Sequence, residues 1–429
     1  MSHYKPYPAY KDSGVEWLGR IPEHWEITPL KYEAEFVNGA AFKPEQWSEI
    51  GTPIIRIENL NGSLNFNCFA GEMDARYHVE QGNLLFGWSG NRGTSFGPFI
   101  WPHAGRHYLN QHIFRICNFK FDKAWFYWSL KAVTAHVEDQ AHGIIGMVHI
   151  TKGDLGRIKI ATPALAEQQA ISAHLDRETA RIDALIEKKT RFIELLREKR
   201  QALITHAVTK GLDPSVKMKT SGVEWLGEVP EHWDVLSFQR CVFIAEGQVD
   251  PEKSPYREMV LLAPNHIESG SGLLLYTETA EEQNAESGKY LCQKGDVVYS
   301  KIRPALRKVC IAPDLSLCSA DMYPMRGHSG MSNQFLFWFL LSEPFSAFAV
   351  LEADRVAMPK INRESLNSVQ LPRPPINEQM EIVAWVAQST ARLDNLRAKT
   401  ERSIELLKER RSALITAAVT GQIDLREAV

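Results

Sequence analysis

The chain contains the same pair of sequence segments twice. SGVEWLGRIPEHWE at 13–26 returns as SGVEWLGEVPEHWD at 221–234, and IELLREKRQALITHAVT at 193–209 returns as IELLKERRSALITAAVT at 404–420. The period is therefore about half of the chain. A period this long excludes solenoids built from short repeats and indicates that a two-part unit has been duplicated.

Between the repeated segments the two halves share a layout but little sequence. Strand-like segments such as GNLLFGWSG and HIFRICNF alternate with turn residues, and GDVVYSK is a counterpart in the second half. Each half has one aromatic run, WFYWSL at 125–130 and FLFWFLL at 335–341. These runs are contiguous and recur at the same place in both halves, so we expect them in a core rather than stacked on bases. We predict two mixed α+β domains of one fold. Neutral drift explains their divergence, but selection for reading two different targets explains it better.

A long helical segment follows each domain, and the first has no proline or glycine between Pro163 and Gly211. Both segments carry an apolar seam with heptad spacing. In the first, the a positions are Leu175, Ile182, Lys189, Leu196 and Leu203, and the d positions are Ile171, Leu185 and Phe192. In the second, they are Val386, Leu393, Thr400, Leu407 and Leu414, with Ile382 and Leu396 at d.

A helix of this length, rising about 1.5 Å per residue, spans roughly 65 Å, too far to hide its seam against one small domain. We predict that the two helices pair as an antiparallel coiled coil with pseudo-twofold symmetry, with a domain at each end of the rod. The alternative is that each helix packs on a different protein. The predicted organisation is a first domain at 1–163 containing the repeat at 12–26, a central helix at 164–211, a second domain at 212–375 containing the repeat at 220–234, and a C-terminal helix at 376–429.

Composition limits the classes of function. Lysine and arginine number 49 against 52 aspartates and glutamates, a net charge of −3, so any DNA-binding surface must be local. The six cysteines contain no C-x-x-C pair, which argues against a zinc knuckle or a disulfide framework. The start of the chain lacks a signal-like apolar region, and the longest strongly apolar run, 335–341, is far shorter than a membrane span. We expect a soluble cytoplasmic protein.

Catalytic motifs are missing from the sequence. An amino-methyltransferase requires a Gly-rich F-x-G-x-G loop and an N/D-P-P-Y/F tetrapeptide, and the sequence has neither. The nearest string, RPPI at 373–376, is interpreted as the prolines that precede a helix. Phosphate-binding, nuclease and G-x-S-x-G motifs are also absent. His24 and His232 recur in the two EHW repeats without ligand partners at metal spacing, so we expect structural roles for them. The sequence predicts a non-catalytic chain that holds no cofactor or metal.

Three repeated motifs together resemble one family. They are EWLGx(I/V)PEHW at the start of each half, EQ-x-x-I at the head of each long helix, and IELLxExRxALIT-x-AVT at its end. This arrangement closely resembles the specificity subunits of type I restriction-modification systems, over essentially the whole chain. GDVVYSKIRPALRK at 295–308, followed by LCSADMYPMR at 317–326, is typical of one group of target recognition domains in that family.

The resemblance implies a protein that reads a bipartite, asymmetric sequence in double-stranded DNA, with one half-site for each target recognition domain and the helices as spacer. Two modification subunits would supply S-adenosylmethionine and methylate adenine N6. Two restriction subunits would supply ATP-driven translocation and cleavage, so S-adenosylmethionine, ATP and Mg belong to the partners. The competing functions are a coiled-coil scaffold that does not read DNA and, against the missing motifs, a self-contained methyltransferase.

Cationic residues gather in one segment of the second half. Between Tyr299 and Lys308 there are four cations and no carboxylate: Lys301, Arg303, Arg307 and Lys308. An arginine can fork onto guanine O6 and N7, whereas the other cations can neutralise phosphates. We expect only one of Arg303 and Arg307 to contact a base. A solvated loop face without a partner is the alternative.

The matching loop of the first half, 86–97, is rich in glycine, which lets its backbone approach a groove closely. It offers Ser89, Asn91, Arg92 and Ser95 for DNA contacts. A second turn offers hydrogen-bonding side chains that differ between the halves, Asn110 and His112 in the first and Ser319 and Asp321 in the second. Different half-sites require such differences, although a hairpin turn without a partner explains this loop too.

Overall fold

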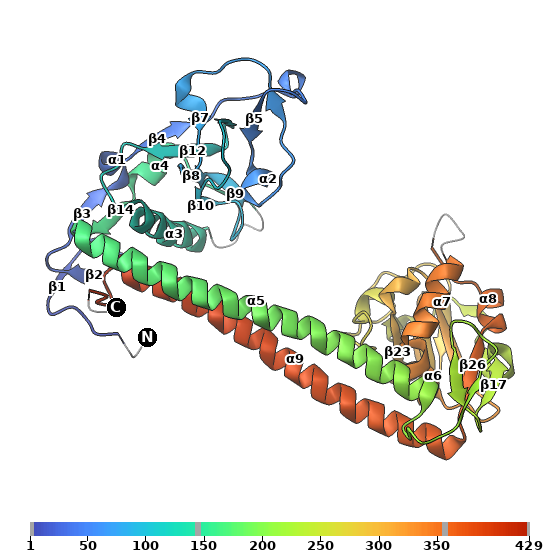
Figure 1. The fold of residues 1–429 in the computed structure, drawn as a ribbon. Coiled ribbons are helices and arrows are strands. Elements are labelled where there is room, and N and C mark those ends of the chain that lie inside the picture. Colours follow the sequence, from blue (N-terminus) through green and yellow to red (C-terminus); the bar gives the residue numbers. More distant parts are fainter. Residues whose placement is uncertain (1–3, 142–146, 354–358, 427–429) are drawn as a thin grey trace. The chain divides into compact units, whose positions relative to one another are not determined.

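The computed structural model describes residues 4–141, 147–353 and 359–426. Its contacts divide the chain into two units, residues 1–189 with 402–429 (unit 1) and residues 190–401 (unit 2). Each unit contains one mixed α+β domain and a part of both long helices (Figure 1).

The two long helices are α5 (Leu165–Lys210) and α9 (Ile376–Val419), and they run antiparallel in each unit. In unit 1, Arg411 near the end of α9 contacts Asp183 in the first half of α5, with Nε 2.9 Å from Oδ1. In unit 2, Arg200 near the end of α5 contacts Asp394 in the first half of α9, with Nε 3.2 Å from Oδ2. The prediction of a mixed α+β fold with an antiparallel helix pair is confirmed.

The predicted heptad seam is only partly correct. The a positions Ile182, Leu196 and Leu414 are buried, but three d positions in the middle of the helices are exposed: Leu185 (42%), Phe192 (40%) and Leu396 (42%). Because a straight helix has 3.6 residues per turn, its buried face drifts by about 20° per heptad away from a strict seven-residue repeat. Ile193, Ile204 and Ile404 are buried instead.

Unit 1 is built from two four-stranded sheets and several short strand pairs (Figure 1). One sheet is antiparallel, in the order β10 (Gly97–Ile100), β8 (Leu84–Gly87), β12 (Ile113–Cys117), β4 (Glu35–Asn38). The other has the order β6 (Cys68–Phe69), β5 (Thr52–Ile55), β11 (His107–Leu109), β7 (His78–Val79), with β5 and β11 parallel. The pairs are β1 (Tyr10–Asp12) with β2 (Arg20–Pro22), β3 (Glu26–Pro29) with β14 (Lys159–Thr162), and β9 (Ser89–Asn91) with β13 (Met147–His149). The helices of its domain are α1 (Leu30–Glu33), α2 (Ile57–Leu60), α3 (Lys123–Gln140) and α4 (Lys152–Arg157).

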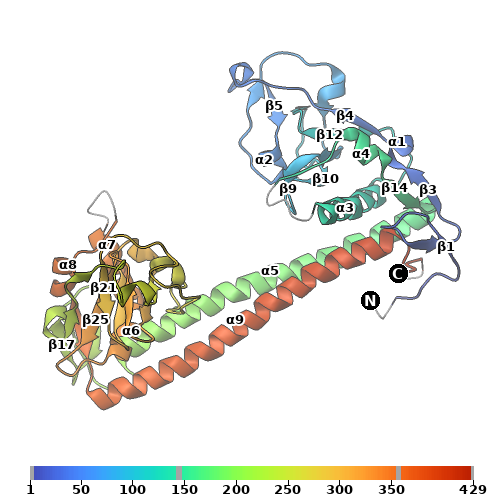
Figure 2. The ribbon, with the colours of Figure 1, turned by 180° about the vertical axis from the view of Figure 1, so that it is seen from behind.

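Unit 2 repeats this plan (Figure 2). Its antiparallel sheet has the order β18 (Val242–Ile244), β25 (Met322–Gly327), β22 (Val297–Ser300), β23 (Val309–Ile311). The second sheet has the order β19 (Gln248–Val249), β21 (Lys289–Cys292), β24 (Ser316–Cys318), β20 (Leu261–Leu262), with β20 and β24 parallel. The pairs are β15 (Met218–Thr220) with β16 (Glu228–Pro230) and β17 (Asp234–Ser237) with β26 (Gln370–Arg373). The helices are α6 (Asn333–Leu340), α7 (Glu343–Ala353) and α8 (Arg363–Ser368).

The aromatic runs form core helices in both units, as predicted. Asp122 caps α3, its carboxylate accepting a hydrogen bond from the Trp125 N–H at 2.9 Å. Ser332 caps α6 in the same way, accepting from the Phe335 N–H at 3.1 Å. Trp125 and Phe335 are fully buried, so these rings serve packing. Among the described residues no single helix is long and apolar enough to cross a membrane, and only α6 and α7 taken together, bent by 65°, meet those criteria.

The repeated EHW segments hold the heads of the long helices. His24 Nε2 lies 3.0 Å from the carboxylate of Glu167 in the first turn of α5, and His232 Nε2 lies 2.8 Å from that of Glu378 in the first turn of α9. A carboxylate is favourable there because the helix dipole is positive at its N-terminus. The expected structural role of both histidines is confirmed.

The repeated helix ends pack on the same EHW segments. The end of α5, including Val208, shares the unit 2 core with Trp233, and the end of α9, including Val419, shares the unit 1 core with Trp25. Gly421 ends α9 with φ +73°, and a Cβ there would lie 2.2 Å from the Pro22 ring. Each domain therefore binds the start of one helix and the end of the other, which explains why both segments are repeated.

Candidate nucleic-acid interface

The two predicted DNA-contacting loops have equivalent backbone positions. In unit 1, the Trp88 N–H donates to the His112 carbonyl at 3.2 Å and the Trp88 carbonyl accepts from Ile150 at 3.0 Å. In unit 2, the Lys301 N–H donates to the Asp321 carbonyl at 2.9 Å and the Lys301 carbonyl accepts from Ile361 at 2.9 Å. Trp88 and Lys301 therefore open equivalent loops, which follow β8 and β22.

The second predicted turn lies beside each loop. Asn110 Oδ1 accepts from the His112 N–H at 3.3 Å, and Ser319 Oγ accepts from the Asp321 N–H at 3.2 Å. Both turns follow a strand that pairs in parallel with its neighbour, β11 with β5 and β24 with β20. The fold thus brings Asn110 and His112 to the first loop, and Ser319 and Asp321 to the second.

In unit 2 the four predicted cations have different environments. Arg307 Nε donates to Ser346 Oγ at 2.8 Å and its guanidinium pairs with Glu343, while Lys308 Nζ donates to the Pro264 carbonyl at 2.6 Å. Lys301 Nζ lies 5.3 Å from the centre of the Tyr323 ring.

Arg303 differs from these three cations. It is exposed, and within the described part of the chain its side chain has no hydrogen bond or ion pair. Arg303 and Arg307 both have the left-handed φ of +47°. A left-handed non-glycine residue is uncommon, and such residues cluster where backbone geometry serves a function. The guanidinium of Arg303 is therefore the most available of the four.

In unit 1, two predicted side chains shape the loop. Ser95 is buried, 1% exposed, and its Oγ accepts from the Asn91 N–H at 2.9 Å. Arg92 donates to the Glu138 carbonyl in α3, and the neighbouring Gly93 N–H donates to the Glu138 carboxylate at 2.9 Å. The side chain of Asn91 stays exposed on the loop.

Two residues that sequence reasoning missed complete the unit 1 surface. Trp88 stacks on Phe114, with ring centroids 5.7 Å apart at 20°, and His149 meets Trp88 edge to face at 4.9 Å and 72°. The indole N–H of Trp88 donates to the Gln111 carbonyl at 2.8 Å. His149 is about 60 residues from this loop in the sequence, and only the β9–β13 pairing brings it there.

Known proteins resemble this chain in sequence and fold. Residues 22–195 match the family described as "Type I restriction modification DNA specificity domain". The EcoDI specificity subunit of a type I restriction enzyme from Escherichia coli is 29% identical over 314 residues, 70% of each chain. The EcoBI specificity subunit, also from Escherichia coli, is 23% identical over 432 residues, 96% of this chain and 89% of that one. The chain is therefore similar to specificity subunits of type I restriction enzymes.

The fold of this chain is also that of a solved chain, from a structure described as concerning complex assembly and conformational transition of the type I R-M system. The likeness covers 93% of this chain and 98% of that one, with a TM-score of 0.69 at 13% identity. At that identity the comparison concerns the fold alone.

In each unit an arginine links the domain to the helix pair. In unit 1, Arg411 contacts Asp183 and lies 5.8 Å from the Trp128 ring of α3. In unit 2, Arg200 contacts Asp394 and lies 5.9 Å from the Trp338 ring of α6. We call these two arrangements the arginine clasps.

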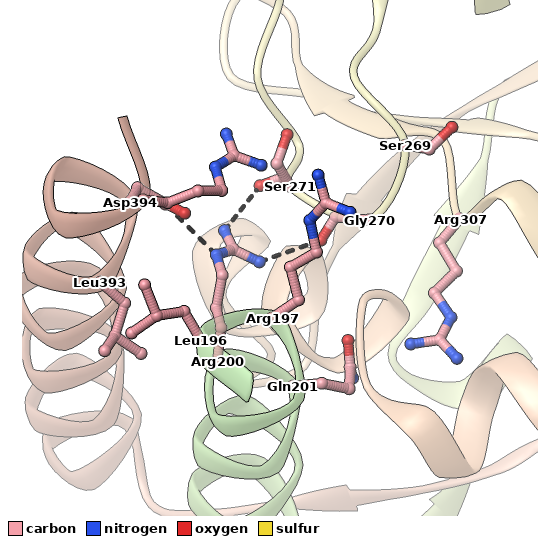
Figure 3. A pocket seen from close by; sticks show the side chains of 11 residues that line it. Leu196, Arg197, Arg200, Gln201, Ser269, Gly270, Ser271, Arg307, Leu393 and Asp394 are labelled. Atoms are coloured by element: carbon pink, nitrogen blue, oxygen red, sulfur yellow. Dashed lines mark hydrogen bonds and ion pairs between the residues drawn. The ribbon is translucent and has the colours of Figure 1, made fainter. Parts of the chain in front are cut away.

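The unit 2 clasp borders a cavity of about 220 Å³ between the helices and the domain (Figure 3). Arg200 donates to the carbonyls of Gly270 at 2.9 Å and Ser271 at 3.0 Å, as well as to Asp394 (Figure 3). The other lining arginines have carboxylate neighbours: Arg397 with Glu268, Arg307 with Glu343, and Arg197 with Glu401. Because each guanidinium is already matched by an acid, we interpret this cavity as a charged joint of the fold.

One lysine of unit 1, Lys131, has a lowered pKa. Lys131 of α3 lies 5.3 Å from the Phe99 ring and 5.4 Å from the Tyr127 ring. Burial, followed by the nearby charge of Arg411, lowers the pKa of Lys131 to about 8. At neutral pH this lysine therefore carries its charge at a cost to the folded state.

Proposed function

We propose that this specificity subunit reads a bipartite, asymmetric sequence in double-stranded DNA, one half-site with each domain. The observation that carries the proposal is the pair of equivalent loops with unlike side chains. Trp88 and His112 in unit 1 stand where unit 2 has Lys301 and Asp321. One scaffold with two sets of donors and acceptors suits two different half-sites, because side chains at base edges select the sequence.

In the second half-site Arg303 is the proposed base contact. Its exposed guanidinium can fork onto guanine O6 and N7, the commonest specific arginine contact in the major groove. Lys301, Arg307 and Lys308 would supply positive charge near the phosphates, and Ser319 and Asp321 further hydrogen bonds. In the first half-site the proposed contacts are made by Ser89, Asn91, Asn110 and His112, with Arg92 and Ser95 supporting the loop.

We also propose two modification subunits as partners that bind this chain. Exposed leucines recur at equivalent helix positions, Leu185 (42%) with Leu396 (42%) and Leu195 (46%) with Leu406 (49%). Repeated exposed apolar residues on both helices support two sites for two copies of one partner. Two restriction subunits complete the proposed complex. Methyl transfer with S-adenosylmethionine, and ATP- and Mg-dependent cleavage, would occur on those partners, and this chain would be non-catalytic.

The test is binding of the chain, assembled with its modification subunits, to a library of duplexes randomised in sequence. The proposal predicts enrichment of one motif with two defined parts separated by unselected bases. Uniform binding of all duplexes would favour a scaffold that holds proteins together without reading DNA, and would overturn the proposal.

A further inference from the structure

His149 occupies the edge of the unit 1 reading surface. It lies in β13, directly opposite Ser89 of the β9 strand, and its side chain is exposed. Its ring meets Trp88 edge to face at 4.9 Å, and the next residue, Ile150, donates its N–H to the Trp88 carbonyl at 3.0 Å. No hydrogen bond from another described residue occupies either ring nitrogen of His149. The imidazole is held in place while its polar atoms remain open.

Lys360 occupies the equivalent place in unit 2. It bridges to Ile302, and the next residue, Ile361, donates its N–H to the Lys301 carbonyl at 2.9 Å, as Ile150 does to Trp88. Lys360 is exposed, and residues 4–141, 147–353 and 359–426 provide no carboxylate in ion-pair contact with it. The carbonyl of Pro359, the residue before Lys360, accepts a hydrogen bond from the Arg303 N–H at 3.0 Å. Lys301, Arg303 and Lys360 therefore gather at one strand end.

The two side chains differ in what they can recognise. A neutral imidazole has one donor and one acceptor in a fixed plane, so it can distinguish base edges. An ammonium group has three rotatable donors on a flexible stem, which suits phosphate neutralisation better than base selection. The contact with Trp88 restricts the His149 ring, which lowers the entropy lost when it contacts a base.

We propose that His149 is a specificity-determining residue of the first half-site, oriented by Trp88, and that Lys360 at the equivalent position is a phosphate contact of the second half-site. This inference rests on the proposed function. It means that the two half-sites are recognised by different chemistry. His149 adds sequence selectivity at the first half-site with little counterion release, whereas Lys360 adds affinity at the second through counterion release.

The experiment uses the complex with modification subunits and duplexes randomised at each motif position, at pH 8, where imidazoles are neutral. His149→Ala should reduce discrimination at one base pair of one half-site by roughly 5- to 150-fold and leave the salt slope unchanged. Lys360→Ala should weaken binding to all sequences alike and reduce the salt slope by about one. His149→Lys should relax the same base pair and increase the slope by about one.

A matched control is Lys188→Ala, which removes an exposed charge from α5 and should change neither quantity. The outcomes separate the two proposals. If the unaltered complex selects no motif, the proposed function fails. If it selects a bipartite motif and His149→Ala preserves every base preference in a complex with unaltered melting, this inference alone is overturned. A base-specific loss for Lys360→Ala would also contradict it.

Discussion

The loops after β8 and β22 begin with equivalent main-chain hydrogen bonds and differ in side-chain chemistry. Both are fixed by main-chain hydrogen bonds to the neighbouring turn and to the strand segment that contains His149 or Lys360. Because main-chain groups hold the loops, the side chains of Trp88 and Lys301 are free to differ without loss of the fold. The comparison teaches that main-chain groups hold each loop while its side chains are left to vary.

The two arginine clasps use equivalent helix residues but differ in their contacts with the domain. Arg200 is held by a carboxylate and two carbonyls of the loop at Gly270 and Ser271, and its side chain is 10% exposed. Arg411 has the carboxylate of Asp183, and its side chain is 29% exposed. Both units thus have the arginine–aspartate contact between the helices, and in unit 2 a loop of the domain also accepts hydrogen bonds from the arginine.

The largest expected effect comes from breaking the unit 2 clasp. Arg200→Ala leaves Asp394 and two carbonyls without their donor and should destabilise the protein by about 2 kcal/mol, because the largely buried guanidinium makes all three hydrogen bonds. Arg411→Ala should cost about 1 kcal/mol, since its pair is closer to solvent. Urea denaturation of both variants measures the difference, with the exposed Arg197→Ala as control. Equal losses for the two clasp variants would refute this account of the asymmetry.

The next effect distinguishes base reading from charge in unit 2. Arg303→Ala should weaken DNA binding by roughly 1 to 3 kcal/mol and relax the preference at one base pair, because its guanidinium is proposed to fork onto a guanine. Lys308→Ala should weaken all sequences alike and lower the salt slope by about one. Methylation of a library randomised at each motif position measures both. Uniform losses for Arg303→Ala would make that residue a phosphate contact, and any change in the other half-site would contradict the division by domain.

The smallest effect concerns Lys131 of unit 1. The pKa of Lys131, lowered to about 8 in the fold, rises to its ordinary value on unfolding, so the unfolded chain binds more protons between about pH 8 and 10. Stability should therefore rise with pH across this window. Lys131→Met should stabilise the protein by about 1 kcal/mol at pH 7, with the gain shrinking towards pH 10. Thermal melting at both pH values provides the measurement, and a gain independent of pH would point to packing instead.

Local sequence patterns predicted the duplication, the α+β class, the antiparallel helices and the buried aromatic runs, because repeats and hydrophobic periodicity can be recognised in the sequence alone. The d positions Leu185 and Leu396 were wrong because a strict heptad ignores the drift of a straight helix. Partners from distant segments were not predictable. Glu343 pairs with Arg307 and the Pro264 carbonyl accepts from Lys308, although neither is near them in the sequence. His149 meets Trp88 only after β13 pairs with β9.

The central claim, one half-site for each domain, is tested most directly by exchanging residues 235–372 for those of another specificity subunit. Methylated adenines are then mapped by single-molecule sequencing in cells that carry the complete system. The account predicts that one half of the methylated motif changes and the other half is retained. A motif altered in both halves, or in neither, from a folded and active exchange protein would contradict it.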